Sequence, residues 1–326
     1  MLKTKLYIKG CGAITPLAEL PKLQLLSNIG TTEKPFLSCI EPDYKLYIEP
    51  MVSRRMSRIM KMGLVAAKMC IKDAQIDKPE AIITSTGLGC IEDTEKFLGN
   101  MILNEEKMLN PTPFIQSTHN TIGAQIAINL KCNGYNITFV HRGHSFESAL
   151  IDAILYSLDN KGADILVGGF DEHTKNSFRI MQRLGLFRNT DVLAGEGAVF
   201  FVLNTMPSEN DYACLRAVEL FGQAETTAIH QWLQTFLAQQ SLDIKTIDLV
   251  LCGSPNDVSS DPELSSFLQG THTQYYKQLC GEYQTASAFA LSLAAKIIKQ
   301  DSSMKNVLIW NNYLQINHSF FLLSAC

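Results

Sequence analysis

Short apolar runs alternate with longer amphipathic stretches along most of the chain. The short runs are rich in β-branched and aromatic residues and end in glycine, proline or polar turns, which is typical of strands. The run at 164–170 is almost continuously apolar, which predicts a strand in a sheet covered on both faces. The predicted strands of the first part of the chain are Lys5–Lys9, Ala81–Ser85, Asn136–His141, Asp164–Phe170 and Gly195–Leu203.

Apolar positions at helical spacing separate these strands. One predicted helix runs from Arg54 to Ala74, with an apolar stripe on one side and Arg54, Arg58 and Lys61 as a basic stripe on another. We interpret the basic stripe as a solvated face, with docking of an acidic partner as the alternative. Further helices are predicted near Glu92–Met101 and over 113–127, after a break at Asn110–Pro113. Residues 27–53 have no regular pattern.

The second part of the chain repeats this rhythm. Its predicted elements are strands at Ala213–Leu220, Ile247–Leu251, Asn306–Trp310 and Ser319–Leu323, with helices near Ala228–Ala238 and Ala286–Lys299. A helix of small residues followed by an apolar strand occurs at 148–167 and again at 286–309, which indicates an internal duplication. Alternating strands and helices predict an α/β architecture, with two halves, 1–205 and 206–326, that share one core.

Composition excludes several classes of protein. The chain has 326 residues and a net charge of −4, which gives no case for nucleic-acid binding, and no apolar run is long enough for a membrane span. Nine scattered cysteines and a start without a signal peptide predict reduced thiols in the cytoplasm. The histidines show no metal-ligand spacing, and Glu92 replaces the third glycine that a dinucleotide site at Gly87 and Gly89 would need. We therefore expect no metal and no cofactor.

The stretch Asn136–Ala153 is the most informative part of the sequence. It predicts a strand, a turn through Gly143 and a helix with Phe146 and Leu150 on its buried side. A turn of this kind suits a nucleophile, because a helix N-terminus lowers the pKa of a thiol and offers N–H donors to an oxyanion. Gly143 has no side chain that could react.

Eight segments occur in the order and spacing found in β-ketoacyl-acyl-carrier-protein synthases, which this chain resembles over nearly its whole length. They are GCGAITPLA at 10–18, STGLGCIEDTE at 85–95, PFIQSTHNTIGAQIA at 113–127, the 136–153 stretch, GEGAVFFVL at 195–203, VLCGSPNDVSSD at 250–261, KQLCGE at 277–282 and NNYLQINHSFFLL at 311–323. The resemblance implies the thiolase fold, a five-layered αβαβα sandwich of two similar halves. It also implies dimerisation through the strand before the nucleophile.

The residues that perform condensation in that family are replaced here. The cysteine position falls on Gly143, the first histidine on Gly253 and the second histidine on Glu282, while Lys277 is retained. Asp261 and Gly281 also match the family pattern, whereas the glutamate partner of the lysine falls on Leu291. The glycine-rich C-terminal loop becomes Tyr313–His318, which contains no glycine.

This pattern favours a non-catalytic subunit that resembles a chain-length factor and pairs with an active ketosynthase. Members of this shortened, cysteine-less kind resemble proteins of aryl-polyene pathways. The expected partner surface is Asn136, Ile137, Thr138, Phe139, Val140 and His141, and an acyl carrier protein would contact Arg54, Arg58 and Lys61. One alternative is an acyltransferase with a displaced site, for which Cys280, His141 and His144 are the candidates. Another is a homodimer that holds an acyl chain or a carrier protein without turnover.

Overall fold

The computed structural model describes residues 5–18, 36–187, 193–222, 229–259 and 261–326. Ten of their strands form one large sheet in the order β10-β9-β11-β12-β8-β1-β7-β5-β3-β4, and two short strands, β2 (Phe36–Leu37) and β6 (Ala194–Gly195), form a second sheet. In the first half the strands are β1 (Leu6–Ile14), β3 (Ala81–Ser85), β4 (Tyr135–Phe139), β5 (Ile165–Asp171) and β7 (Gly197–Asn204). In the second half they are β8 (Cys214–Phe221), β9 (Leu249–Cys252), β10 (Thr273–Tyr275), β11 (Asn306–Tyr313) and β12 (Asn317–Ser324).

The two halves have the same strand order. When the strands of each half are numbered in chain order, the order from the outer edge of the sheet to the junction of the halves is 3-2-4-5-1 in both. In both halves the fifth strand is antiparallel to its two neighbours. The halves join where β1 pairs with β8 through Leu6 and Tyr7. The repeated strand order is the structural counterpart of the internal duplication inferred from the sequence. The predicted boundary at 205/206 lies in the connection from β7 to β8.

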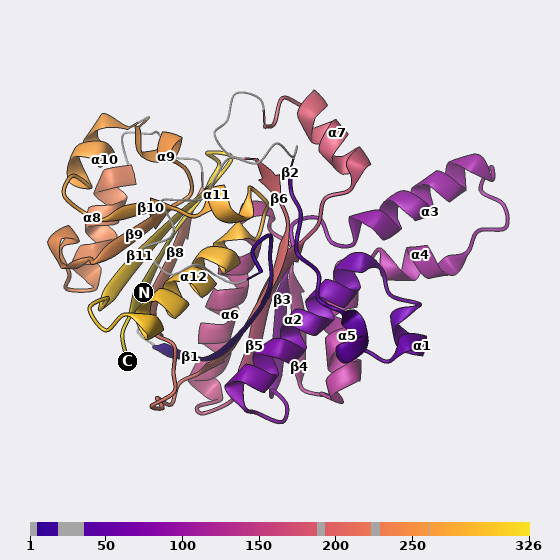
Figure 1. Cartoon of the computed structure of the whole chain (residues 1–326), viewed down its shortest axis with the longest axis horizontal. Coiled ribbons are helices and arrows are strands. Elements are labelled where there is room, and N and C mark those ends of the chain that lie inside the picture. Colours follow the sequence, from indigo (N-terminus) through magenta and orange to yellow (C-terminus); the bar gives the residue numbers. More distant parts are fainter. Residues whose placement is uncertain (1–4, 19–35, 188–192, 223–228, 260) are drawn as a thin grey trace.

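Helices cover both halves of the sheet and fill the space between them, as Figure 1 shows. Helices α6 (Ser145–Asp159) and α12 (Ala286–Gln300) share a core with strands of both halves. Helices α2 (Arg58–Ala74) and α5 (Thr121–Leu130) cover the outer face of the first half, and α8 (Ile229–Gln239) and α10 (Pro262–Phe267) that of the second. The layers therefore run helix, sheet, helix, sheet, helix, as expected from the sequence.

The remaining elements are short or lie outside these layers. They are β2 (Phe36–Leu37), β6 (Ala194–Gly195), α1 (Pro50–Ser53), α3 (Ile91–Leu103), α4 (Pro111–Gln116), α7 (Lys175–Arg183), α9 (Pro255–Ser259) and α11 (Lys277–Cys280), with 3-10 turns at η2 (Tyr44–Leu46), η3 (Arg142–His144) and η5 (Ile244–Thr246). Helices α3 and α4 pack on each other through Phe97 and Phe114 and extend away from the layered body (Figure 1).

Several predicted elements differ from the structure. The strand predicted as Lys5–Lys9 is β1, which continues to Ile14. The helix predicted from Arg54 begins at Arg58, because the chain ends α1 at Ser53 and turns before α2. The helix predicted over 113–127 is two helices, α4 and α5, separated at 117–120. The strand predicted as Asn136–His141 is β4, which ends at Phe139, so Val140 and His141 lie beyond it. Ala228, the predicted start of α8, and part of the irregular 27–53 segment lie outside the described residues.

Candidate functional site

The turn that carries a nucleophile in the resembled family is η3, between β4 and α6. Ser145 fixes it, since its hydroxyl donates to the carbonyl of Arg142 at 2.7 Å and accepts from the amide of His141 at 2.8 Å. Arg142 has a φ of 51°, in the left-handed region that non-glycine residues seldom adopt. Gly143 is buried at the centre of this turn.

The space where a nucleophile would stand at Gly143 is filled by Tyr313. A Cβ placed on Gly143 would lie 2.5 Å from Cβ and 2.6 Å from Cγ of Tyr313, closer than real Cβ contacts. Tyr313 ends β11, and the hairpin that follows places Leu314 and Gln315 at φ of 54° and 56°. From the resemblance we expect the family's glycine-rich loop at the position of this hairpin. A cysteine at 143 and a tyrosine at 313 therefore cannot coexist in this geometry.

His144 supports the same hairpin. Its Nε2 lies 3.1 Å from the carbonyl oxygen of His318, and its Nδ1 lies 3.2 Å from the side-chain amide of Asn317. With Nε2 as donor and Nδ1 as acceptor, a neutral ring satisfies both contacts. Burial also lowers the pKa of His144. Because both nitrogens are engaged, His144 has the position of a structural histidine. His141 is exposed, with Nδ1 3.2 Å from the hydroxyl of Ser148.

The position of the first family histidine, Gly253, is also closed. A Cβ there would lie 2.7 Å from Oδ2 of Asp257 and 3.2 Å from Cε of Lys277. Asp257 accepts from the side-chain amide of Asn312 at 3.0 Å, and burial raises its pKa. Asp261, which matches the family, caps α10 by accepting from the amides of Glu263 and Leu264. A larger side chain at position 253 would therefore collide with Asp257 and Lys277.

Lys277 and Glu282 form a buried ion pair. Lys277 is 1% exposed, and its ammonium donates to Oε2 of Glu282 at 2.7 Å and to the carbonyl of Asn312. Burial raises the pKa of Glu282 to about 7, against the opposing effect of Lys277. Leu291, where the family has the lysine's glutamate partner, is fully buried in the apolar core. The carboxylate that balances Lys277 is therefore that of Glu282.

Cys280 is buried on α11, and its thiol donates to the carbonyl of Gly281 at 3.2 Å. Burial raises its pKa well above the ordinary value, so the thiolate needed for reaction is disfavoured. Gly281 has a φ of 77°, and a Cβ on it would lie 2.5 Å from Cα of Gly195. The family glycine at 281 is thus retained by a close contact between the two halves of the chain.

The predicted basic stripe is not continuous. Arg58 forms a bidentate ion pair with the buried carboxylate of Glu196, at 2.6 and 2.7 Å, and also binds Glu41. The ammonium of Lys61 lies 5.5 Å from the ring centre of Tyr44. Arg54 is exposed and precedes α2. The prediction of one basic face was wrong, because Arg58 turns toward a carboxylate 138 residues away in the sequence.

Tyr313, Asp257 and Asn312 were not singled out from the sequence, although they fill this site. In the sequence, Tyr313 stands out only as a bulky residue where the resemblance implies a glycine-rich loop. Within the described ranges, no group of three or more His, Cys, Asp or Glu side chains is placed to hold a metal ion. No helix among the described residues is long and apolar enough to cross a membrane.

This chain belongs to the beta-ketoacyl synthase family, since the model of that family's N-terminal domain matches residues 39–234. Comparison with curated proteins found no match. Among solved structures, the ishigamide ketosynthase/chain length factor is similar, with a TM-score of 0.79, 16% identity and coverage of 99% of this chain and 100% of that one. A ketosynthase in complex with its chain length factor from Xenorhabdus doucetiae is similar with a TM-score of 0.76 and 14% identity, covering 99% of this chain and 98% of that one.

A chain from the structure of a type II polyketide synthase acyl carrier protein in complex with its ketosynthase is also similar to this chain. Its TM-score is 0.80 at 14% identity, with coverage of 99% of this chain and 100% of that one. At these identities the likeness establishes the fold, which is the thiolase-like ketosynthase fold predicted from the sequence.

Proposed function

We propose that this chain is a non-catalytic, chain-length-factor-like subunit that pairs with an active β-ketoacyl synthase in fatty-acid or polyketide biosynthesis, with an aryl-polyene pathway as the favoured context. The observation that carries the proposal is the occupied nucleophile position. Condensation needs a thiolate at the turn and hydrogen-bond donors at the thioester oxygen. Here Tyr313 takes the place of the nucleophile's side chain, and Glu282 offers an acceptor already paired with Lys277.

The free edge of β4 supports pairing with a second subunit. Among the described strands, β4 ends the large sheet and pairs on one side only, with β3. An unpaired edge is a template for strand addition by another chain. On this proposal, residues Asn136–His141 contact the partner, with Asn136–Phe139 supplying the strand and Val140, which is 46% exposed, lying at its end.

An apolar arm next to this edge also favours a large interface. Exposed apolar side chains gather on α3, α4 and the segment between them: Leu98, Ile102, Leu103, Met108, Phe114 and Ile115. Helix α5, which follows α4, packs on β3 and β4 and exposes Ile128. Exposed apolar surface of this extent is typical of interaction sites. The arm and β4 together would form the surface that the partner ketosynthase covers.

The contact with an acyl carrier protein needs a revised location. Arg58 is committed to Glu196, which leaves Arg54 as the exposed cation of the three residues predicted from sequence. Helix α7 exposes Lys175, Arg179 and Arg183 at four-residue spacing, and no ion pair within the described residues engages them. Three cations on one helical face suit an acidic surface. We therefore place the carrier-protein contact on α7, with Arg54 as a second point.

The test is co-expression with the ketosynthase encoded nearest to this chain, followed by size-exclusion chromatography and mass analysis. The proposal predicts a stable 1:1 complex whose condensing activity is lost when this chain is omitted. Val140→Asp should weaken the complex, because it puts a charge beside the strand edge, whereas Met206→Asp, also at an exposed apolar position, should not. A homodimer that ignores the ketosynthase would contradict the proposal.

The alternative of a displaced active site has less support. Its best thiol, Cys280, is buried with a raised pKa, and His144 has both ring nitrogens engaged. The alternative of a homodimeric acyl-binding protein would need a ligand-sized apolar cavity away from Gly143, because Tyr313 fills the space there.

A further inference from the structure

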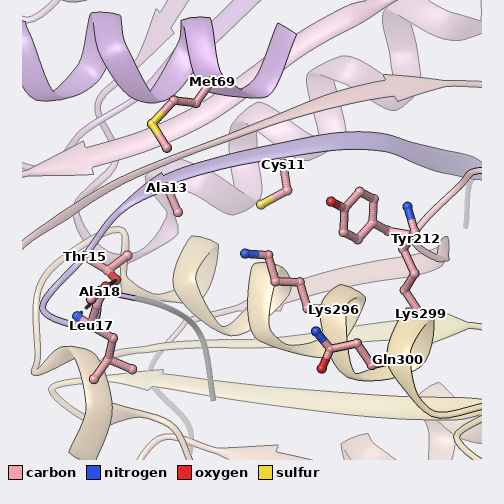
Figure 2. A pocket seen from close by; sticks show the side chains of 10 residues that line it. All are labelled: Cys11, Ala13, Thr15, Leu17, Ala18, Met69, Tyr212, Lys296, Lys299 and Gln300. Carbon is pink, nitrogen blue, oxygen red and sulfur yellow. Dashed lines mark hydrogen bonds between the residues drawn. The ribbon is translucent and has the colours of Figure 1, made fainter. Parts of the chain in front are cut away.

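A cavity of about 560 Å³ lies where the two halves of the chain meet, and none of the former catalytic positions lines it. Its walls come from β1, the segment that follows β1, α2, Tyr212 just ahead of β8 and the C-terminal part of α12 (Figure 2). The volume is within the range of small-molecule sites, which is about 300–1,000 Å³. We refer to it as the β1–α12 cavity.

One charged group in the β1–α12 cavity, Lys296, has no acidic partner among the residues that the structure describes. Lys296 stands on α12, whose other side chains are almost all apolar or small, and it is only partly exposed. Figure 2 shows its ammonium directed into the cavity, toward the side lined by Ala13 and Thr15. No hydrogen bond or ion pair to another described residue engages it. An ammonium directed into a cavity can hold an anion there by a charge-assisted hydrogen bond.

The second lysine of the cavity is already engaged. The ammonium of Lys299 donates to the carbonyl of Asn210 at 2.8 Å and lies 3.8 Å from the ring centre of Tyr212. Among the described residues no acidic side chain lines the cavity, although the carboxylate of Asp73 accepts from the amide of Cys11 at 2.9 Å behind its wall. The ammonium of Lys296 suits a single negative charge, and none of the described lining residues is an arginine that could grip a phosphate with two parallel hydrogen bonds. The polar end of the cavity therefore fits a monocarboxylate better than a phosphate.

The rest of the lining is apolar enough to hold a hydrocarbon chain. Ala13, Leu17, Ala18 and Met69 line the cavity from β1, the segment after it and α2. Burying apolar surface of a ligand is worth about 25 cal/mol per Å². Methionine also adapts its shape to a flexible ligand. An aliphatic chain lying on these residues would leave its carboxylate near Lys296.

We propose that the β1–α12 cavity binds an aliphatic monocarboxylate of medium chain length, with the carboxylate at Lys296 and the chain against Leu17 and Met69. The binding is non-covalent and does not depend on the function proposed above, since it involves neither the β4 edge nor the Gly143 turn.

The experiment is a titration of the full chain, carrying ¹³C-methyl methionine, with octanoate as the probe. Met69 lines the cavity, and Met69→Leu identifies its methyl signal while nearly keeping the volume. We expect a saturable shift of the Met69 signal and none at the remote, exposed Met51. Lys296→Met should weaken octanoate binding about tenfold or more, because it removes the charge and keeps the aliphatic stem. Lys305→Met, exposed and outside the cavity, is the matched control.

Two further probes separate the ligand chemistries. Octanol should bind about tenfold or more weaker than octanoate, and its affinity should not change in Lys296→Met. Octyl phosphate should bind no tighter than octanoate. No shift at Met69 up to millimolar octanoate, equal affinity in wild type and Lys296→Met, or shifts at all methionines alike would each overturn the proposal. Tighter binding of octyl phosphate would overturn the assignment to a carboxylate.

Discussion

The contact between Gly143 and Tyr313 makes the most specific prediction about this chain. Gly143→Ala adds only the Cβ, which would lie 2.5 Å from Cβ and 2.6 Å from Cγ of Tyr313. Gly143 is not among the residues of positive φ, so an alanine fits the backbone itself and the cost comes from the contact. Overpacking of this kind costs about 1–3 kcal/mol. Tyr313→Gly alone removes the whole of a large, mostly buried side chain, including its Cβ, and should cost roughly 3–5 kcal/mol.

The double variant decides between overpacking and an independent loss of stability. If Tyr313 fills the space at 143, Gly143→Ala should cost little once the whole side chain of Tyr313 is gone, and the double variant should resemble Tyr313→Gly alone. The coupling between the two substitutions should be about 1–3 kcal/mol, measured by urea denaturation of all four proteins. Gly99→Ala is the control for a glycine with no atom near its Cβ. A Gly143→Ala variant as stable as wild type, or costs that simply add, would refute the account of a filled site.

Three further predictions concern the buried charges and thiols. Glu282→Leu should cost roughly 3–5 kcal/mol by urea denaturation because it leaves Lys277 buried without its carboxylate, and adding Lys277→Met should recover most of that loss. Burial raises the pKa of Glu172 from 4.5 to about 8, so the folded state binds this proton more tightly than the unfolded state does. The contribution of Glu172 to the free energy of unfolding should therefore fall as the pH rises from about 4.5 to 8. Glu172→Gln should flatten that fall, and an unchanged pH profile would contradict the prediction. Thiol titration near pH 7.5 should give one fast-reacting cysteine, Cys326, which is the exposed one, and a fast Cys280 would favour the displaced-site enzyme instead.

Much of the fold could be predicted from the sequence because its signals are local. The strand at Ala81–Ser85 has the predicted bounds, and the strands at 164–170 and 306–310 match β5 and β11 with small shifts. Period and turn chemistry act within a few residues, so they can be recognised without tertiary information. The duplicated order of small-residue helix and apolar strand also corresponds to a real repeat of strand order.

The parts that sequence missed depend on contacts between distant residues. Arg58 seemed part of a surface stripe, but it pairs with Glu196 across 138 positions of sequence. Tyr313 fills the space at Gly143 from 170 residues away, and no local pattern reports such a contact. The absence of a reactive side chain at Gly143 could be recognised from the sequence, whereas the contact with Tyr313 that fills this space could not. Helix α7, with its exposed cations, lies in a stretch for which the sequence predicted no element.

The central claim is that this chain contributes no acyl-carrying nucleophile to a condensing pair. The most direct test is intact-mass analysis of the complex with its ketosynthase after incubation with an acylated carrier protein. We predict an acyl adduct on the ketosynthase subunit and none on this chain. A stoichiometric acyl adduct on this chain, with the ketosynthase's own cysteine replaced by alanine, would contradict the claim.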